Sequence, residues 1–379
     1  MKKKAIAAGH ICLDITPAFP ESMAGKSLIP GQLIHMDGIT LSIGGAVPNT
    51  GLSMRLLGAE TKLMGKIGKD EFGKIILDEL KKYGSDQDMV ISPDESTSWT
   101  IAIALPGIDR TLLHMPGTND TFGANDLKTE ELKDAVLFHF GYPTLMKKMY
   151  QNRGDDLLEM LRLAKSCGPL VSLDMAGIDP GSEVGRVDWE EILKKILPFV
   201  DFFVPSAEEL CYMLDRDLYR EWHERAGDGD VCDYLYGKEV RALVDRVLEF
   251  GAKTALIKCG ASGLYCRTTG KDRMNEICRR LELDPGSWID REYFEPSYVP
   301  DIIPSGTGAG DTCIGAYLAA ILQGESLPEA LHLAAGEGAC CVSSYDTLSG
   351  LLPMDALKEK IRSGWKKQEN DRFEGIERA

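Results

Sequence analysis

Apolar runs typical of buried strands alternate with helical segments along most of this 379-residue chain. Helical spacing marks residues 155–166, 190–197 and 239–250, and the apolar runs read KAIAAGHICLDI, AVLFHFGYP, PLVSLDMAG, VDFFVPS and TALIKCG. This alternation predicts an α/β fold, with a central, mostly parallel sheet between helices. Ligands bind such sheets at the carboxyl ends of the strands, where we expect Asp14, Asp174 and Ser206.

The composition argues against several kinds of partner. The net charge is −16 and no dense lysine–arginine face is present, so we expect neither nucleic acid nor anionic membrane as a partner. The N-terminal run MKKKAIAAGHICLDI imitates a signal peptide, but His10 and Asp14 interrupt it. No stretch approaches the roughly 20 apolar residues that span a bilayer. We therefore expect a cytoplasmic protein.

Cysteine and histidine spacing predicts no metal centre held by protein side chains. The ten cysteines include no CxxC pair, and the six histidines show no HExxH-like spacing. Most cysteines lie in apolar patterns such as IKCG and GACCV. Reduced, buried thiols that act as small apolar side chains are the better interpretation.

Four segments depart from the main pattern. Residues 28–43 and 97–116 are β-rich, and we expect a small lid sheet built from about 15–43 and 97–118; edge strands of the main sheet are the alternative. Residues 215–237 and 270–298 are polar and read as insertions beyond the core. The charged tail after about residue 365 is expected to fray.

A glycine-rich turn precedes a helix in PSGTGAGDTCIGAYLAAIL, residues 304–322. Gly306, Gly308 and Gly310 let successive backbone N–H groups converge, and the N-terminus of the helix, expected from about Thr312, attracts an anion. Asp311 is therefore a carboxylate beside an anion site. By itself, it could simply be an acid that favours a helix N-terminus.

A second stretch changes this interpretation. Residues 44–73 read GGAVPNTGLSMRLLGAETKLMGKIGKDEFG. Together with SGTGAGDTCIGA, this stretch resembles the two signatures of the ribokinase-like (PfkB) carbohydrate kinases, in the same order. Shorter similarities at GHICLDI, PGTND, VPSAEEL and IKCGASGL extend the resemblance over most of the chain. It implies one domain over 1–379, a three-layer α/β sandwich with a small β-sheet lid.

The resemblance also implies a role for Asp311. In such kinases the amides of the glycine turn, here Gly308, Ala309 and Gly310, hold the transferring phosphoryl group, and the aspartate accepts the proton of the attacking sugar hydroxyl. ATP with Mg²⁺ is the implied donor. Positioning and charge neutralisation are what phosphoryl transfer requires, so the chemistry is consistent.

Other site residues follow from the resemblance. On the sugar side it implies Asp14, Gly44, Gly45 and Asn49, although an aspartate and glycines could serve only as turn residues. On the nucleotide side it implies Lys258, Gly260, Gly263 and Ser206, with Glu209 on the metal. Ser206 stands where asparagine is usual, Lys258 where threonine is common, and Ser206 with Glu209 is also a plain capping box.

Departures from the family pattern bear on the substrate. No acid stands near Gly141, which argues against ribose, and Ala46, Val47 and Pro48 supply no cation for a substrate phosphate. Ser305 replaces a frequent aspartate, which leaves open whether a monovalent cation activates the enzyme. The expected substrate is an unphosphorylated sugar or sugar acid.

Two rival functions remain. A nucleoside kinase shares both signatures, and Trp99 could stack on a base. A non-catalytic sugar- or nucleotide-binding regulator is the alternative outside the enzymes. The resemblance also allows a homodimer that pairs through the lid.

Overall fold

A nine-stranded sheet runs through the computed structural model of the chain, which describes residues 3–107 and 110–379. Residues 108–109 of the expected lid segment, and residues 1–2, lie outside the described part. The strand order is β15-β14-β13-β12-β11-β10-β9-β1-β4. The bounds are β1 (Lys4–Gly9), β4 (Glu60–Met64), β9 (Leu137–Gly141), β10 (Leu170–Leu173), β11 (Phe202–Phe203), β12 (Thr254–Lys258), β13 (Gly263–Thr268), β14 (Glu292–Pro296) and β15 (Glu377–Arg378).

The predicted parallel arrangement is confirmed. The apolar runs form β1 and β9 to β12, and each of these strands pairs in parallel with its neighbours among them. Only β13 runs antiparallel to its neighbours, β12 and β14. Strands covered on both faces need apolar side chains on both, which explains their continuous apolar sequences.

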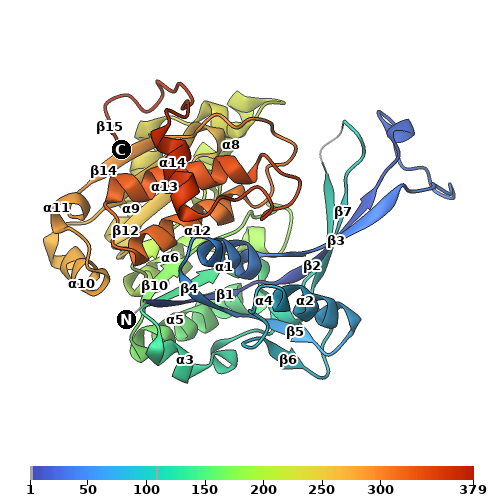
Figure 1. The fold of residues 1–379 in the computed structure, drawn as a ribbon, viewed down its shortest axis with the longest axis horizontal. Coiled ribbons are helices and arrows are strands. Elements are labelled where there is room, and N and C mark those ends of the chain that lie inside the picture. Colours follow the sequence, from blue (N-terminus) through green and yellow to red (C-terminus); the bar gives the residue numbers. More distant parts are fainter. Residues whose placement is uncertain (1–2, 108–109) are drawn as a thin grey trace.

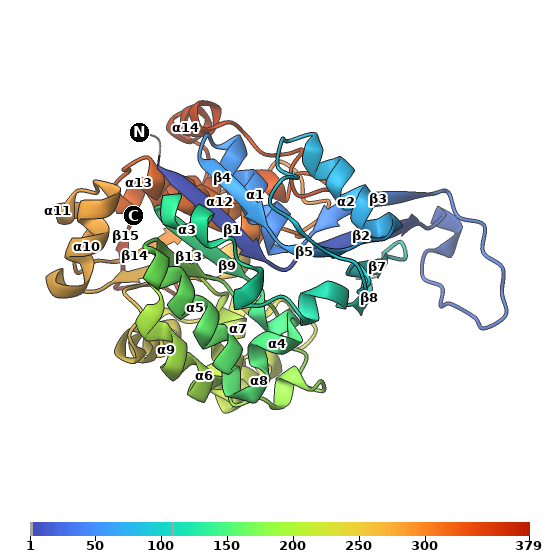
Figure 2. The same ribbon diagram turned by 90° about the horizontal axis from the view of Figure 1, so that it is seen from below.

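Helices cover both faces of this sheet (Figures 1 and 2). One apolar core lies between the sheet and α5, α6, α7 and α9, and a second lies between the sheet and α1, α10, α12 and α13. The bounds are α1 (Ala46–Leu56), α2 (Glu71–Lys81), α3 (Thr129–Asp134), α4 (Lys147–Tyr150), α5 (Asp155–Cys167), α6 (Trp189–Ile196), α7 (Ala207–Leu214), α8 (Arg216–Ala226), α9 (Gly237–Phe250), α10 (Lys271–Leu281), α11 (Pro285–Trp288), α12 (Ala309–Leu322), α13 (Leu327–Cys341) and α14 (Met354–Arg362).

A separate four-stranded sheet projects from the body (Figure 1). Its order is β3-β2-β7-β8, with β2 (Cys12–Ala18), β3 (Gly38–Gly44), β7 (Trp99–Ile103) and β8 (Thr111–Met115). The strands are therefore not edge strands of the main sheet. A third sheet pairs β5 (Lys66–Gly68) with β6 (Val90–Ser92).

Two expectations about this small sheet need correction. Asp14 does not end the first strand of the main sheet, because β1 stops at Gly9 and Asp14 lies in β2. The chain turns at His10, within a run that is apolar on both sides, so the sequence reads as one strand. Residues 28–37 contain no strand, and β3 begins only at Gly38.

The two expected insertions differ in structure. Residues 215–237 contain α8 and a 3₁₀ turn at Val231–Tyr234. Residues 270–298, by contrast, are not wholly beyond the core, since they supply β14 to the main sheet. Glu295 in β14 is buried, and Lys367 and His332 lie within 2.7 Å and 2.9 Å of its carboxylate. Because these partners of Glu295 lie far away in sequence, the local pattern of this buried strand resembles that of a polar surface segment.

The C-terminal tail is docked on the body and is not frayed as expected. Phe373 is fully buried, and its ring stacks on Phe294 with centroids 3.8 Å apart. Beyond it, β15 pairs in parallel with β14. One buried aromatic ring therefore fixes a segment whose sequence is otherwise charged.

We predict that Phe373→Ala lowers the free energy of unfolding by about 3–5 kcal/mol, because the lost ring leaves a cavity. Urea unfolding followed by fluorescence would measure the change. Tyr345→Ala is the matched control, since the Tyr345 side chain is 86% exposed and its loss should cost less than about 0.5 kcal/mol. Equal stability of both variants would contradict the docked tail.

Candidate active site

The candidate site lies where the strand order reverses. From β1 the chain continues to β4 on one side, whereas β9 and β10 follow on the other. A crevice opens at the carboxyl ends of strands that diverge in this way. Gly9 ends β1 and Gly141 ends β9, and the His10 amide donates to the carbonyl of Gly141 at 3.2 Å.

The glycine turn forms the N-terminus of α12, which begins at Ala309 rather than near Thr312. Gly308 caps this helix with φ 77°, a left-handed conformation that favours glycine. A Cβ at Gly308 would lie 2.3 Å from Cγ2 of Thr347, so a side chain is also excluded by contact. No side chain caps the helix, which leaves its first amides available to an anion.

Asp311 lies in the first turn of α12 and is 3% exposed. Nδ2 of Asn49 donates to its Oδ2 at 3.0 Å, and the Tyr142 hydroxyl lies 2.7 Å from both Oδ1 and Oδ2. Burial raises the pKa of Asp311, while the two donors and the charge of Lys258 limit that rise. Asp311 is thus an oriented carboxylate beside the amides of an anion site.

Tyr142 is a site residue that the sequence analysis missed. It directly follows Gly141, the position at which an acid was sought and not found. The only sequence signal was an aromatic residue at the carboxyl end of a buried strand. Its side chain is not predicted by that pattern to reach a residue 169 positions away.

Asp14 lies against Gly44, which Gly45 follows; their role toward a sugar stays a prediction. Cys12 and Gly44 are register partners in β2 and β3, and a Cβ on Gly44 would lie 1.9 Å from Oδ2 of Asp14. Burial raises the pKa of Asp14, and hydrogen bonds from Cys12 and Thr100 oppose this rise. The absence of a side chain at Gly44 therefore leaves the space that the Asp14 carboxyl group occupies.

His10 is a second residue that the sequence analysis did not assign. It is 2% exposed, and a Cβ on Gly45 would lie 2.6 Å from its Nδ1. Its ring centroid is 5.3 Å from that of His114 in β8 and 6.0 Å from that of Tyr142. Burial lowers the pKa of His10 to about 3, so the imidazole is neutral near pH 7.

The small sheet also reaches the glycine turn. Arg110, which directly precedes β8, donates a hydrogen bond to Oγ1 of Thr307. Its charge also acts on Asp14, whose pKa it lowers. Together with the ring contact between His10 and His114, this contact brings the small sheet close to the end of β1 and the start of α12.

Lys258 ends β12 and forms a buried ion pair, with Nζ 2.7 Å from Oδ1 of Asp174. A Cβ on Gly310 would lie 3.8 Å from Nζ of Lys258, so the ammonium group lies beside the N-terminus of α12. Although burial favours the neutral amine, the charges of Asp174 and Glu209 raise the pKa of Lys258. A fixed positive charge therefore lies next to the candidate anion site.

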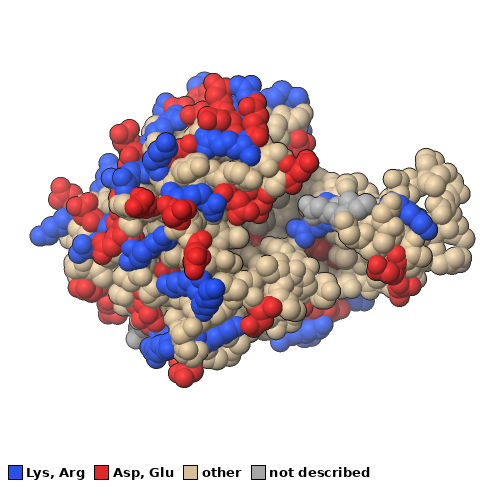
Figure 3. Space-filling model, turned by 90° about the horizontal axis from the view of Figure 1, so that it is seen from above, with Lys and Arg blue, Asp and Glu red and all other residues tan. Residues whose placement is uncertain are grey.

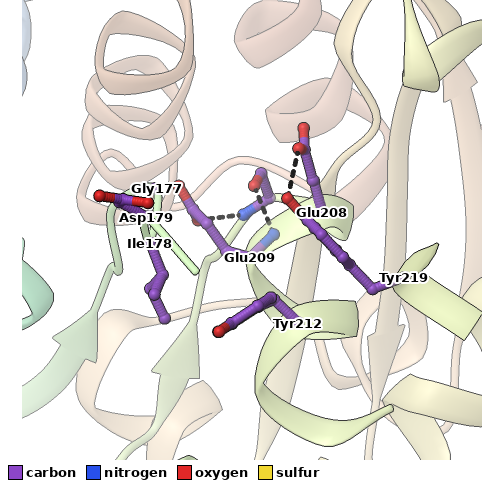
Figure 4. A pocket seen from close by; sticks show the side chains of 8 residues that line it. Gly177, Ile178, Asp179, Glu208, Glu209, Tyr212 and Tyr219 are labelled. Atoms are coloured by element: carbon purple, nitrogen blue, oxygen red, sulfur yellow. Dashed lines mark hydrogen bonds between the residues drawn. The ribbon is translucent and has the colours of Figure 1, made fainter. Parts of the chain in front are cut away.

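Ser206 and Glu209 form the capping box that the sequence predicted for α7. The Ser206 amide donates to Oε2 of Glu209 at 2.7 Å, and the Glu209 amide donates to Oγ of Ser206 at 3.2 Å (Figure 4). Both residues line a cavity of about 340 Å³, together with Asp179, Glu208 and Tyr212. The cap is a structural role, and a role toward a metal stays a prediction.

The acids fit a magnesium nucleotide better than a metal held by protein alone. No group of three or more potential metal ligands occurs in residues 3–107 and 110–379. Mg²⁺ is commonly bound by one or two carboxylates together with substrate phosphates and water. The charge of Glu209 acts on Lys258 and Asp311 at the candidate anion site, where such an arrangement is expected.

Gly260 and Gly263 form the turn between β12 and β13, with φ values of 55° and 132°. A Cβ on Gly260 would lie 2.5 Å from Sγ of Cys232, which belongs to the insertion at 215–237. The hydroxyl of Ser262 donates to the Cys232 carbonyl at 2.8 Å. The insertion therefore packs directly against the turn that was predicted to line the nucleotide.

Comparison with known proteins identifies the family of the chain. Residues 3–353 match the pfkB family of carbohydrate kinases. An uncharacterised sugar kinase of Archaeoglobus fulgidus is 23% identical over 303 residues, which cover 79% of this chain and 98% of the relative.

Among the described helices, none is long and apolar enough to cross a membrane.

Solved structures show the same fold. A fructokinase with bound ATP from Xylella fastidiosa superimposes with a TM-score of 0.70 at 18% identity, covering 96% of this chain and 99% of that chain. An Arabidopsis thaliana ribokinase complexed with ribose and ATP gives 0.67 at 18% identity, with coverages of 94% and 98%. The chain has a ribokinase-like fold and belongs to the pfkB family of carbohydrate kinases.

Proposed function

We propose that this kinase transfers the γ-phosphoryl group of ATP to a hydroxymethyl group of an unphosphorylated sugar or sugar acid. The observation that carries the proposal is Asp311, a buried and oriented carboxylate in the first turn of a helix whose N-terminal amides lack a side-chain cap. A base and an anion site side by side are what an attacking hydroxyl and a transferring phosphoryl group require.

In this mechanism Asp311 accepts the proton of the attacking hydroxyl as its oxygen approaches phosphorus. The amides of Gly308, Ala309 and Gly310 stabilise the charge of the transferring group. Lys258 adds a positive charge at the same helix end, 2.7 Å from Asp174. Glu209 would hold the Mg²⁺ ion, which neutralises phosphate charge when it is bound with ATP.

The residues on the sugar side support an unphosphorylated acceptor. Asp14 and Asn49, with the backbone at Gly44 and Gly45, would bind sugar hydroxyls. The following residues, Ala46 to Pro48, are buried and apolar, so they offer no cation to a substrate phosphate.

We further propose that the small sheet is a lid and a dimer surface. A lid excludes water, which prevents hydrolysis of ATP. The exposed apolar side chains on its strands include Ile39, Leu41, Leu112 and Leu113. Figure 3 shows few charged side chains on the visible face of this projecting arm. We propose that a second copy of the chain covers this surface, which gives a homodimer. The location that we propose for it is the cytoplasm.

We predict that Asp311→Asn lowers kcat by at least about 10²–10⁴-fold, because the amide cannot accept the proton. ADP release would be measured with Mg-ATP and a panel of ketoses, aldoses, sugar acids and nucleosides. Asp217→Asn is the control, since this side chain is 87% exposed on the insertion. Full activity of Asp311→Asn on a good acceptor would refute the assigned base, and turnover of nucleosides alone would favour a nucleoside kinase.

A separate prediction concerns Lys258. Lys258→Met should lower the free energy of unfolding by about 3–5 kcal/mol, because it leaves Asp174 buried without its ion pair. Adding Asp174→Leu should restore most of this stability and leave phosphoryl transfer low. Thermal unfolding and ADP release would be measured for both variants.

Lys133→Met is the control for the Lys258 experiment. Lys133 forms a 2.7 Å pair with Glu130 at the surface, and such pairs contribute less than about 1 kcal/mol. If the double variant recovers activity along with stability, Lys258 has a structural role only.

A further inference from the structure

Tyr142 has a backbone conformation that a tyrosine rarely adopts. Its φ and ψ are 68° and 40°, in the left-handed region, and Pro143 follows it. A bulky residue in this region is uncommon, and a following proline restricts it further. Strain of this kind tends to occur at functional sites, where the surrounding structure holds it in place.

The adjacent glycine explains how Tyr142 comes to occupy this part of the site. A Cβ on Gly141 would lie 2.2 Å from Cβ of Ala46, so the close approach of α1 excludes a side chain there. The carboxyl end of β9 can therefore present a side chain only from the next residue. The left-handed turn at Tyr142 places its hydroxyl 2.7 Å from both oxygens of Asp311.

We propose that Tyr142 is the positioning residue of the catalytic base: its hydroxyl donates to Asp311, aims the carboxylate and keeps it ionised. This inference rests on the proposed role of Asp311. The phenol keeps its proton throughout, and the proton of the attacking hydroxyl moves to Asp311 as the new oxygen–phosphorus bond forms.

The hydrogen bonds also distinguish the two oxygens of Asp311. The single proton of the Tyr142 hydroxyl is shared between Oδ1 and Oδ2, and among the described contacts Oδ2 also accepts from Nδ2 of Asn49, which leaves Oδ1 the less occupied oxygen. A carboxylate oxygen has two acceptor positions. The geometry therefore assigns Oδ1 as the oxygen that takes the substrate proton.

Several charged groups face this pair. Lys258 from β12 favours the ionised form of Asp311, whereas burial and Glu209 from α7 oppose it. Asp174 from the end of β10 acts on Tyr142, and Cys341 of α13 is within electrostatic range of Asp311. His10 is neutral near pH 7. Because Lys258 favours the ionised form of Asp311 while burial and Glu209 oppose it, the hydrogen bonds donated by Asn49 and Tyr142 are a main stabiliser of the ionised carboxylate.

The phenol itself is suited to donate. Burial and the charges of Asp311 and Asp174 raise the pKa of Tyr142 well above its usual value. Tyr142 therefore does not compete with Asp311 as a base. A hydrogen bond to the ionised form lowers the pKa of a carboxyl group, so loss of the hydroxyl must raise the pKa of Asp311.

The test is the pH dependence of kcat/KM for Tyr142→Phe, with the acceptor identified by the panel. In the wild type kcat/KM rises with pH as Asp311 ionises, and this rise is the acid limb of the profile. In the variant the acid limb should lie at higher pH by about one unit. The KM for ATP should stay unchanged. A role in packing alone would leave the acid limb in place, because phenylalanine fills the same space.

Tyr265→Phe is the matched control, since it removes a hydroxyl that lies 2.5 Å from Oε1 of Glu292, in β13 and β14. Its acid limb should equal that of the wild type. An unmoved limb in Tyr142→Phe overturns the inference while Asp311→Asn remains inactive. Full activity of Asp311→Asn would instead overturn the proposed function.

A second measurement applies if Tyr142→Phe does not fold. Fluorotyrosine placed at residue 142 has a more acidic phenol, which donates more strongly and keeps the shape of the side chain. The acid limb should then move to lower pH. A limb that stays in place, or moves to higher pH, would overturn the inference.

Discussion

The approach of the N-terminus of α12 to the strand ends is the constraint on which the site depends. This helix is buried along its length and packs closely on α1, where a Cβ on Gly315 would lie 2.6 Å from Oγ of Ser53. The close packing brings Asn49 within 3.0 Å of Asp311, although 262 positions separate them. The apolar packing of two helices thus fixes the proposed base beside the candidate anion site.

Burial has a cost at this site that the surrounding residues offset by pairing. Carboxylates and an ammonium lose hydration when they are buried, and this loss is tolerable only when each has a partner. Asp174 pairs with Lys258, and Asp311 accepts from Asn49 and Tyr142. The same pairs leave a fixed positive charge and an oriented carboxylate where the proposed phosphoryl transfer needs them. Stability and chemistry therefore depend on the same contacts.

The parts of the fold that the sequence predicted were those with strong local signals. Continuous apolar strands, helical periodicity and the capping box of Ser206 and Glu209 all arise from neighbouring residues, and the structure has each of them. The predictions were wrong for β14 and for the C-terminal tail, where contacts with residues remote in sequence determine the structure. Glu295 is tolerated in β14 because Lys367 and His332 pair with it, and Phe373 docks the charged tail on Phe294.

The sequence by itself determined the parallel sheet, the glycine turn and the position of Asp311 at a helix N-terminus, because apolar period, positive φ and helix polarity are local properties. Only the tertiary structure decided that Asp14 belongs to the small sheet, that His10 lies beneath it, and that Tyr142 reaches Asp311. These arrangements depend on where the chain turns and which strands diverge. Close approaches at Gly45 and Gly141 fix them, and such contacts join residues that no local pattern connects.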